Sequence, residues 1–520
     1  MTESKTESRS EHAGDMLRRR GDAPAVIMAG SGETRTYAEL DDRSTRLARV
    51  FDEAGLVPGD HIAVLLANQL EYFDAAWAAL RAGLYLTPIS WHLGSDEAGY
   101  IIEDCGARAL VTTSAMAELV SGLGPRAKHL ELRLSVGGGI DGYDDFDDVL
   151  AHASGIPRDD EREGMLMLYS SGTTGRPKGI LPPVSTSSFG TARGGIATIA
   201  KQFYDVDDSA VYLSPAPLYH AAPLGWTLAG HRLGATVVVM ERFDAAGTLE
   251  AIERHRVTHA QFVPTHFVRM LRLPEAVRTS ADLSSLRRVI HAAAPCPVPI
   301  KHQMIDWVGP IVDEYYGGSE GFGLCAIGAQ EWLDHPGSVG RSVFNEVHIV
   351  DESGAELGPD ETGQIWFSAA GRFEYHNDPE KTERATDARG WATYGDIGHV
   401  DGDGYLYLTD RATNMIISGG VNIYPQEAEN VLTVHPAVYD VAVLGVPDVE
   451  MGERVKAFVV AVDPPADPDK LAVELINHCR GEIAHYKCPR ELVFVDELPR
   501  LESGKLLKRR LLDEVEGIGG

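Results

Sequence analysis

A run of small and hydroxylated residues that ends in a lysine is the clearest candidate for chemistry in this chain. It follows the apolar stretch Met165 to Leu168 and reads Tyr169-Ser170-Ser171-Gly172-Thr173-Thr174-Gly175-Arg176-Pro177-Lys178-Gly179. Glycines let backbone amides approach an anion closely, hydroxyl groups donate further hydrogen bonds, and Lys178 adds positive charge. The run therefore predicts a phosphate-binding loop after a strand. It lacks the GxxxxGK[ST] spacing of a Walker A loop, and taken alone it is also compatible with a flexible surface loop.

Six further motifs follow along the chain. They are Pro217-Leu218-Tyr219-His220, Tyr316-Gly317-Gly318-Ser319-Glu320, Tyr394-Gly395-Asp396, Asp410-Arg411, Ser418-Gly419-Gly420 with Asn422-Ile423-Tyr424-Pro425, and Pro499 to Lys505. Together with the first loop they resemble, in order and spacing, the motifs of the adenylate-forming superfamily. That superfamily includes acyl- and aryl-CoA synthetases, luciferases and the adenylation domains of peptide synthetases. The resemblance extends from about residue 20 to about residue 515 and is closest to the acyl-CoA synthetases.

The resemblance implies a ligase that works in two steps. A carboxylate attacks the α-phosphate of ATP and expels pyrophosphate, and the acyl group of the resulting adenylate passes to the thiol of coenzyme A. The site must therefore neutralise charge spread over three phosphates and hold the nucleophile in line. The implied ATP site consists of Ser170, Ser171, Gly172, Thr173, Thr174, Gly175, Lys178, Ala293, Ala294, Pro295, Tyr316, Gly317, Ser319, Asp396, Arg411 and Lys505.

Several of these residues have individual roles by resemblance. Asp396 accepts hydrogen bonds from both ribose hydroxyls, which a carboxylate with two oxygens can do, and Arg411 assists it. Glu320 is the expected ligand of Mg²⁺, a hard ion that prefers carboxylate oxygen. Lys505 bridges the substrate carboxylate and the α-phosphate as charge develops, although a basic carboxyl-terminal cluster is more often a solvated tail. His220 gates coenzyme A, and its alternative is a buried structural histidine.

The acyl pocket is expected to combine aromatic and small residues. Its implied lining is His220, Ala221, Trp226, Phe262, Tyr315, Gly317, Phe322 and Gly323, and the implied entry for coenzyme A is Ser418, Gly419 and Gly420. This lining favours a compact apolar acid, whether aromatic, alicyclic or medium-chain. The same residues are equally compatible with an ordinary core.

Two positions depart from the pattern of the superfamily. Ser319 replaces the usual threonine of the YGxTE motif and keeps the hydroxyl group. Thr413 stands where relatives usually carry an aspartate or lysine as the pivot of domain rotation. We expect the hinge to lie at Thr413 and still to turn there, and the effect of threonine on the balance between the two domain poses stays open.

The elements that must position these residues follow from the hydrophobic pattern. Helical and strand-like segments alternate from Tyr37 to Thr113 and again from Val211 to His291, which predicts two α/β lobes with mainly parallel sheets. Short strands with turn signals between about Val343 and Ser418 predict a β-rich subdomain. The predicted fold is α/β, with an amino-terminal domain over residues 14–412 and a small mobile α+β domain over residues 413–520.

Composition narrows the classes of partner. The chain has 520 residues, 44% of them hydrophobic, and a net charge of −30, which repels polyanions and argues against nucleic acid. No window has the roughly 18 apolar residues that a membrane-spanning helix needs, so we expect no membrane insertion. Five scattered cysteines favour a reducing cytoplasm without structural zinc or disulfides. The oligomeric state stays open, with a homodimer as one option.

Three functions of different classes remain to be weighed. The favoured one is an AMP-forming acyl- or aryl-CoA synthetase that uses ATP, Mg²⁺ and coenzyme A. The alternatives are an adenylating ligase that passes the acyl group to an amine or a carrier protein, and a non-catalytic nucleotide-binding relative. The last is disfavoured because Lys178, Glu320, Asp396, Arg411 and Lys505 are all present. An amino-acid substrate is disfavoured because Tyr219-His220-Ala221-Ala222 lacks the aspartate that pairs with an ammonium group.

Overall fold

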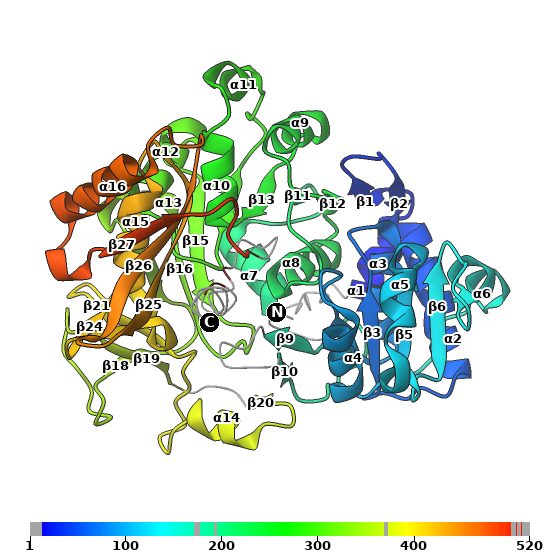
Figure 1. Cartoon of the computed structure of the whole chain (residues 1–520). Coiled ribbons are helices and arrows are strands. Elements are labelled where there is room, and N and C mark those ends of the chain that lie inside the picture. Colours follow the sequence, from blue (N-terminus) through cyan, green and yellow to red (C-terminus); the bar gives the residue numbers. More distant parts are fainter. Residues whose placement is uncertain are drawn as a thin grey trace, which may run out of the picture. The chain divides into compact units, whose positions relative to one another are not determined.

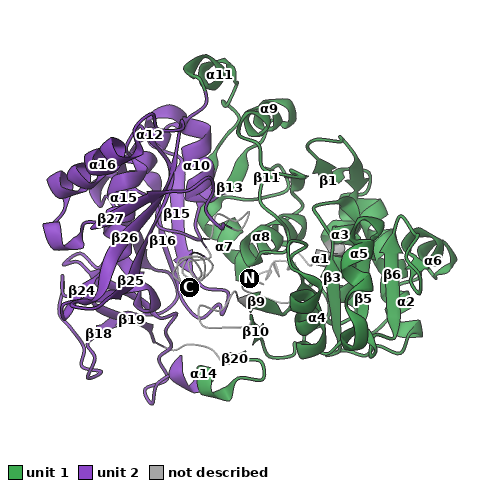
Figure 2. Ribbon diagram, viewed as in Figure 1, with its two compact units in different colours: residues 1–261, 274–288, 372–382 green, residues 262–273, 289–371, 383–520 purple. Residues whose placement is uncertain are grey.

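The computed structural model describes residues 13–170, 177–191, 195–368 and 373–500, together with residues 506 and 511. The chain divides into two compact units (Figure 2). Unit 1 comprises residues 1–261, 274–288 and 372–382, and unit 2 comprises residues 262–273, 289–371 and 383–520.

The first sheet of unit 1 has six strands in the order β7-β6-β5-β3-β4-β8, and every pair in it is parallel, as the alternating pattern predicts. Figure 1 shows β3, β5 and β6 side by side in blue and cyan. The strands are β3 (His61–Leu65), β4 (Tyr85–Pro88), β5 (Ala107–Thr113), β6 (Leu132–Val136), β7 (Asp144–Asp145) and β8 (Met165–Leu166). The helices of this part are α1 (Ala13–Arg19), α2 (Tyr37–Glu53), α3 (Leu70–Arg81), α4 (Ser95–Asp104), α5 (Ala117–Ser121) and α6 (Phe146–His152), with the short 3₁₀ turns η1 (Ser114–Met116) and η2 (Gly124–Ala127).

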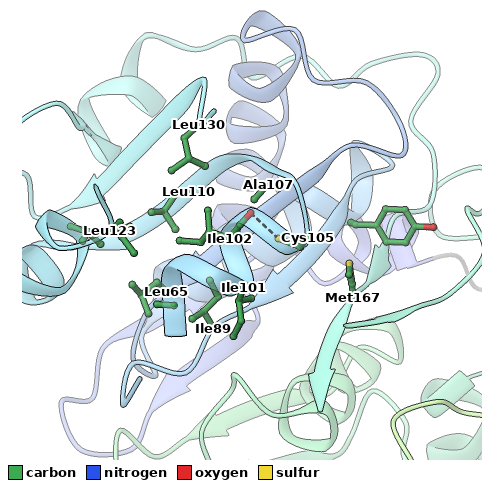
Figure 3. Close-up of a cluster of buried hydrophobic side chains, with 14 residues drawn as sticks. Leu65, Ile89, Ile101, Ile102, Cys105, Ala107, Leu110, Leu123, Leu130 and Met167 are labelled. Atoms are coloured by element: carbon green, nitrogen blue, oxygen red, sulfur yellow. Dashed lines mark hydrogen bonds between the residues drawn. The ribbon is translucent and has the colours of Figure 1, made fainter. Parts of the chain in front are cut away.

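Helix α4 is fixed to this sheet by a cluster of buried apolar side chains (Figure 3). Ile101 and Ile102 of the helix are buried with Leu110 of β5 in this cluster, and the thiol of Cys105 donates a hydrogen bond to the carbonyl of Ile102 at 3.5 Å. Met167, which follows β8, is buried in the same cluster. The end of α4 and the chain that leads toward the predicted phosphate loop are therefore held by one core.

The second sheet of unit 1 has the order β13-β11-β12-β1-β2 and is parallel except for its edge strand β2. It confirms the second predicted α/β lobe. Its strands are β1 (Pro24–Met28), β2 (Thr34–Thr36), β11 (Val211–Ser214), β12 (Thr236–Val239) and β13 (His259–Phe262). The helices of this part are α7 (Gly195–Tyr204), α8 (Ala221–Arg232), α9 (Ala245–His255) and α11 (Glu275–Ser280).

A small antiparallel sheet carries the flanks of the predicted phosphate loop. It consists of β9 (Leu168–Ser170), β10 (Lys178–Leu181) and β20 (Glu374–Tyr375) in the order β20-β10-β9. The single strand expected over Met165 to Leu168 is wrong in extent, because β8 and β9 belong to different sheets. The chain changes sheets at Met167, whose amide still donates to the carbonyl of Leu86 at 2.9 Å.

The large sheet of unit 2 runs in the order β18-β19-β21-β22-β17-β16-β15-β14 and is antiparallel except for β14 with β15. Its strands are β14 (Arg288–His291), β15 (Val312–Gly317), β16 (Leu324–Ile327), β17 (Ser338–Ser342), β18 (Val347–Val350), β19 (Gly363–Phe367), β21 (Asp396–Val400) and β22 (Leu406–Arg411). The helices are α10 (Pro264–Leu271), α12 (Val298–Val308), α13 (Ala329–Asp334) and α14 (Pro379–Arg384), the last of which begins in unit 1.

The carboxyl-terminal part of unit 2 is a five-stranded sheet with two main helices. It contains β23 (Ile416–Ser418), β24 (Val421–Ile423), β25 (Val438–Asp448), β26 (Gly452–Ala461) and β27 (Glu491–Phe494), with α15 (Pro425–Thr433), α16 (Pro468–Glu482), η3 (Ala412–Asn414) and η4 (His485–Lys487). This part therefore has the α+β composition that the sequence predicts. The domain boundary at residues 412 and 413 stays a prediction. Among the helices of the described residues, none is both long enough and apolar enough to cross a membrane.

Candidate active site

The predicted phosphate loop is described only at its two flanks. Ser171, Gly172, Thr173, Thr174 and Gly175 lie outside the described residues, as does Lys505. The Cα atoms of Lys178 and Ser170 are partners in the β9-β10 pairing, so the loop connects two adjacent antiparallel strands. The strand-to-loop context that the sequence predicts is thus present.

Asp104, at the end of α4, ties both flanks of the loop to the first sheet. The hydroxyl of Tyr169 on β9 donates to Asp104 Oδ2 at 2.6 Å, and burial raises the pKa of that hydroxyl well above its usual value. His376 Nε2 lies 2.9 Å from the carbonyl of Asp104, and the amide of His376 donates to the carbonyl of Gly179 at 2.8 Å. These contacts fix β9 and β10, the strands that flank the loop, to the end of α4.

Lys178, the first residue of β10, forms an ion pair with Asp378. Its Nζ lies 3.2 Å from Asp378 Oδ2, with the two side chains 33% and 19% exposed. The other oxygen of Asp378 accepts a hydrogen bond from the amide of Lys381 at 3.0 Å. That amide, more than Lys178, lowers the pKa of Asp378. The pair presents an oriented ammonium group that solvent and ligands can still reach.

His220 directly precedes α8 in unit 1. Its backbone is extended, with φ −90° and ψ 150°, and its ring lies 4.3 Å from the ring of Tyr219. Ala221 begins the helix and is half-buried. Trp226 is buried and stacks on Tyr212 with the ring centroids 6.1 Å apart. The part of His220, Ala221 and Trp226 in an acyl pocket stays a prediction.

Unit 2 assembles a compact cluster around the carboxylate of Asp396. The hydroxyl of Tyr316 donates to Asp396 Oδ2 at 2.6 Å, and Arg411 Nε lies 3.3 Å from Asp396 Oδ1. The second contact joins directly opposite residues, because Asp396 and Arg411 pair across the β21-β22 hairpin. The structure therefore brings together three residues that the sequence places 80 and 15 positions apart.

Burial dominates the electrostatics of this cluster. It raises the pKa of Asp396 above its ordinary value, while Arg411 and the Tyr316 hydroxyl act in the opposite direction and Glu320 adds to the rise. It also raises the pKa of Tyr316 far above its usual range. An ionised carboxylate has acceptor positions beyond these two contacts, and hydrogen bonds made in a dry site are strong. Asp396 can thus accept further hydroxyl donors such as those of a ribose.

Tyr394 braces the glycine-rich turn that follows Tyr316. Its hydroxyl accepts from the amide of Gly323 and donates to the carbonyl of the same residue, each at 2.9 Å. Phe322 stacks on its ring with centroids 4.1 Å apart. A Cβ atom on Gly318 would lie 2.3 Å from the Tyr394 ring, so only glycine fits there. Gly317 and Ser319 are exposed beside this turn, and Tyr315 and Glu320 are half-buried.

The predicted adenine segment lies after β14, whose neighbour in the sheet is β15 with Tyr316. Ala293 has φ 76°, a conformation that costs a residue with a side chain free energy, and such strain concentrates at functional sites. Ala294 and Pro295 are exposed next to it. The carbonyl of Phe262, a predicted acyl-pocket residue, accepts from the amide of Ala292 at 3.4 Å. The part of this segment in binding adenine stays a prediction.

The predicted hinge is bracketed by one carboxylate. Asp410 Oδ1 accepts from the amide of Arg411 and from Asn414 Nδ2, and its Oδ2 accepts from the amide of Gln426 at 3.1 Å. Thr413 lies exposed within η3 between these contacts. The role of Thr413 in domain rotation stays a prediction.

The Gly419-Gly420 pair forms the two-residue turn between β23 and β24. Both glycines have positive φ, 59° and 78°, which a tight hairpin of this kind requires. They are exposed, while Ser418 before them is buried. The turn leaves an accessible backbone loop, and its part in the entry of coenzyme A stays a prediction.

Residues 14–374 match the model of the AMP-binding enzyme family, and residues 427–505 match that of the AMP-binding enzyme C-terminal domain. This chain belongs to the AMP-binding enzyme family. The predicted superfamily, the ligase class and the α/β fold are confirmed.

Known AMP-binding enzymes resemble this one over nearly their full length. A feruloyl-CoA synthase of Amycolatopsis sp is 36% identical over 488 residues, which cover 93% of this chain and 94% of the relative. The anthranilate CoA ligase AuaEII, solved in complex with anthranoyl-AMP, is 25% identical with a TM-score of 0.83 and 97% coverage of each chain. The amide bond synthetase McbA from Marinactinospora thermotolerans is 28% identical with a TM-score of 0.81 and coverage of 96% and 98%.

Several residues of this AMP-binding enzyme that shape the site were missed from the sequence. Asp104, His376 and Asp378 carry no motif, and their contacts join segments up to 273 positions apart. Tyr394 belongs to the motif Tyr394-Gly395-Asp396, and its aromatic ring next to the other two residues was the sequence feature that could have indicated its role.

Proposed function

We propose that this AMP-binding enzyme joins an aromatic carboxylic acid to coenzyme A through an acyl-adenylate. The observation that carries the proposal is the cluster of Tyr316, Asp396 and Arg411, an acceptor site suited to a ribose, in a chain of this family. The aromatic class is supported by the feruloyl-CoA synthase and anthranilate CoA ligase relatives and by the rings among the predicted pocket residues. Asp396 would bind the ribose, Ala293 to Pro295 with Tyr316 the adenine, and Lys178 with Lys505 the phosphates.

Mg²⁺ would be held by Glu320 together with phosphate oxygens of ATP. In the described part of the chain there is no cluster of three or more metal-ligating side chains, so side chains alone do not form a complete metal site there. A single carboxylate next to substrate phosphates is the usual arrangement for this ion. Glu320 fits, because it is half-buried, its Oε2 lies beside Gly318 in the turn that Tyr394 braces, and a carboxylate is a ligand that Mg²⁺ prefers. When bound, the ion would neutralise charge on the phosphates.

The change Glu320→Gln tests this assignment. The amide keeps the size of the side chain and removes its charge, so we expect the concentration of Mg²⁺ needed for half-maximal pyrophosphate release to rise about tenfold or more. Glu331→Gln is a control on a carboxylate of α13 that hydrogen-bonds to Tyr405. An unchanged Mg²⁺ dependence in the Glu320→Gln enzyme would remove this residue from the metal site.

An acid panel tests the proposed substrate class. Pyrophosphate release from ATP is measured with benzoic, cinnamic, cyclohexanecarboxylic, medium-chain and long-chain acids at equal concentration. We expect the highest kcat/KM with aromatic acids. A preference for long-chain acids would overturn the aromatic class while leaving the ligase intact.

A second candidate is an amide ligase, favoured by the 28% identity to McbA over 96% of this chain. The first half-reaction is the same, and only the acceptor differs. Competition between coenzyme A and a panel of amines for the preformed acyl-adenylate separates the two. We expect the thioester to form faster at equal acceptor concentration, and predominant amide formation would favour the second candidate.

A further inference from the structure

We infer that Asp378 is a positioning residue for Lys178: its carboxylate holds the lysine in the orientation in which the ammonium group meets the phosphates of ATP. This inference rests on the proposed function, because it takes Lys178 as a phosphate ligand. It adds a residue that no motif marks.

Asp378 is itself fixed by the backbone around it. Its amide donates to the carbonyl of Tyr375 at 3.0 Å, and its carbonyl accepts from the hydroxyl of Thr382 at 3.0 Å. That hydroxyl accepts in turn from the amide of Tyr375 at 2.9 Å. Residues 375–382 are therefore closed into a rigid turn that begins α14.

The turn is joined to the strand that begins with Lys178. Ile180 of β10 pairs with Tyr375, and Asn377 Nδ2 donates to Asp104 Oδ1 at 3.4 Å. Asn377 has φ 55°, a left-handed conformation that turns the chain sharply just before Asp378. Lys178 and Asp378 thus stand on two sides of one small framework, and neither can shift far without the other.

The two oxygens of the carboxylate serve different partners. Oδ1 accepts from the amide of Lys381 in the first turn of α14, and Oδ2 faces Lys178 Nζ at 3.2 Å. Asp244 makes the same kind of helix cap, since its Oδ1 accepts from the amide of Gly247 at 2.6 Å. Within the described residues, Asp244 has no ion pair, so capping alone does not require a lysine nearby. The pairing with Lys178 is a separate function of Asp378.

Holding the lysine has a physical consequence for nucleotide binding. A free lysine side chain has several rotatable bonds, and binding a phosphate must freeze them. A lysine that is already oriented loses less entropy when ATP arrives. The charge of Asp378 opposes this gain by repelling the phosphates, but both side chains are partly exposed and salt screens that repulsion. We therefore expect orientation to dominate.

A double-mutant cycle on ATP binding tests the inference directly. Affinity for MgATP is measured by isothermal titration calorimetry without any acid, for the wild type, Lys178→Ala, Asp378→Ala and the double variant. We expect Asp378→Ala to weaken binding about fivefold, the scale of a partly exposed ion pair. We expect the double variant to bind no more weakly than Lys178→Ala alone, because the aspartate then has nothing to position.

Three further variants separate positioning from folding. Asp378→Asn keeps the helix cap and an oxygen acceptor, so it should fall between the wild type and Asp378→Ala and serves if the alanine variant does not fold. Asp244→Ala and Asp244→Asn remove and preserve the matched cap on α9 and should leave ATP affinity unchanged. An equal loss from Asp378→Ala in the presence and absence of Lys178, or no loss at all, would overturn the inference. An enzyme that shows the expected ATP cycle but forms no thioester would overturn the proposed function and leave the inference standing.

Discussion

In unit 1, Lys178 and Asp378 form their ion pair with 33% and 19% of the side chains exposed, whereas in unit 2 the carboxylate of Asp396 is only 10% exposed. Asp378 has a lowered pKa because backbone and lysine donors surround it, and Asp396 has a raised pKa because it is buried. Lys178, which is proposed to bind the phosphates, is therefore open to water. Asp396, which is proposed to bind the ribose, is buried.

The difference suggests two ways of handling one anionic nucleotide. The ribose and adenine are neutral, and buried acceptors and rings can recognise them without a large charge. The triphosphate changes its charge distribution during the reaction, and cations that reach it from exposed positions can follow that change. We expect the loss of a cation to affect the rate most, and damage to the buried cluster to affect stability as well as binding.

The largest effect is expected from the cation with the most direct role. Lys505→Ala should leave the fold intact and reduce acyl-adenylate formation at least about a hundredfold, the scale of a lost transition-state contact. Thioester formation from supplied acyl-adenylate should survive. Rapid-quench measurement of each half-reaction checks this, and near-normal pyrophosphate release would exclude Lys505 from the mechanism. Lys508→Ala is the matched control from the same basic segment.

A proline at the hinge should divide the two half-reactions. Thr413→Pro fixes φ near −65° and removes a backbone donor, so we expect one domain pose to be trapped and one half-reaction to slow by about tenfold or more. Thr413 is exposed, so little packing is lost. Single-turnover assays of adenylation and thiol transfer measure the two rates, with Thr413→Ala as the control. Normal rates of both halves in the folded proline variant would place the hinge elsewhere.

The buried cluster should be sensitive to a single methyl group. Gly318→Ala places a Cβ within 2.5 Å of the Tyr394 ring and of Glu320 Oε2, so we expect the free energy of unfolding to fall by about 1–3 kcal/mol and the affinity for ATP to fall with it. Gly402→Ala is the control, because nothing lies within 4 Å of its added Cβ. Urea unfolding and ATP titration check both. Equal stability of the two variants would mean that the turn is not packed as described.

The smallest expected effect is a change in melting temperature, which should have opposite signs for variants of Asp396 in unit 2 and Asp378 in unit 1. The raised pKa of Asp396 means that its ionised form costs the folded state free energy at neutral pH, so Asp396→Asn should raise the melting temperature at pH 7 while weakening ATP binding. The pKa of Asp378 is lowered from its ordinary value of 3.8, so its carboxylate stabilises the fold at pH values above 3.8. Asp378→Asn should therefore lower the melting temperature at pH 7. We expect about 1 °C in each case.

Both changes in melting temperature should become smaller as the pH falls. The gain from Asp396→Asn should vanish as the pH falls through the raised pKa of that carboxyl group. The loss from Asp378→Asn should shrink as the pH falls below about 4. Thermal unfolding of the wild type and both variants from pH 3 to pH 8 measures this, as far as the fold survives. Shifts of the same sign at pH 7 would contradict the contrast between the two units.

The sequence predicts most of what is local and little of what is distant. Strand-like segments were predicted between Val211 and His291 and between Val343 and Ser418, and β14 and β18 lie within these stretches, because a short apolar run between turn signals is a local pattern. The second stretch also contains the turn at Asp401, whose Oδ1 accepts from the amides of Asp403 and Tyr405. The break at Met167 was not predictable, since it depends on which of two sheets each half of the apolar run Met165 to Leu168 joins.

The candidate site divides in the same way. Motif residues such as Tyr316, Asp396 and Arg411 could be assigned together only through the resemblance, and the structure joins them by hydrogen bond and ion pair. Asp378 has no pattern of its own, because an isolated aspartate before a proline signals a helix start and nothing about a lysine 200 positions earlier. Such pairs depend on the tertiary fold.

Acid-dependent exchange of labelled pyrophosphate into ATP tests the central claim most directly, since it reports reversible adenylate formation. We expect exchange with an aromatic acid in the complete absence of coenzyme A, and, once coenzyme A is added, one AMP released for each thioester formed. Exchange that requires coenzyme A, or the release of ADP and phosphate in place of AMP and pyrophosphate, would contradict an acyl-adenylate mechanism.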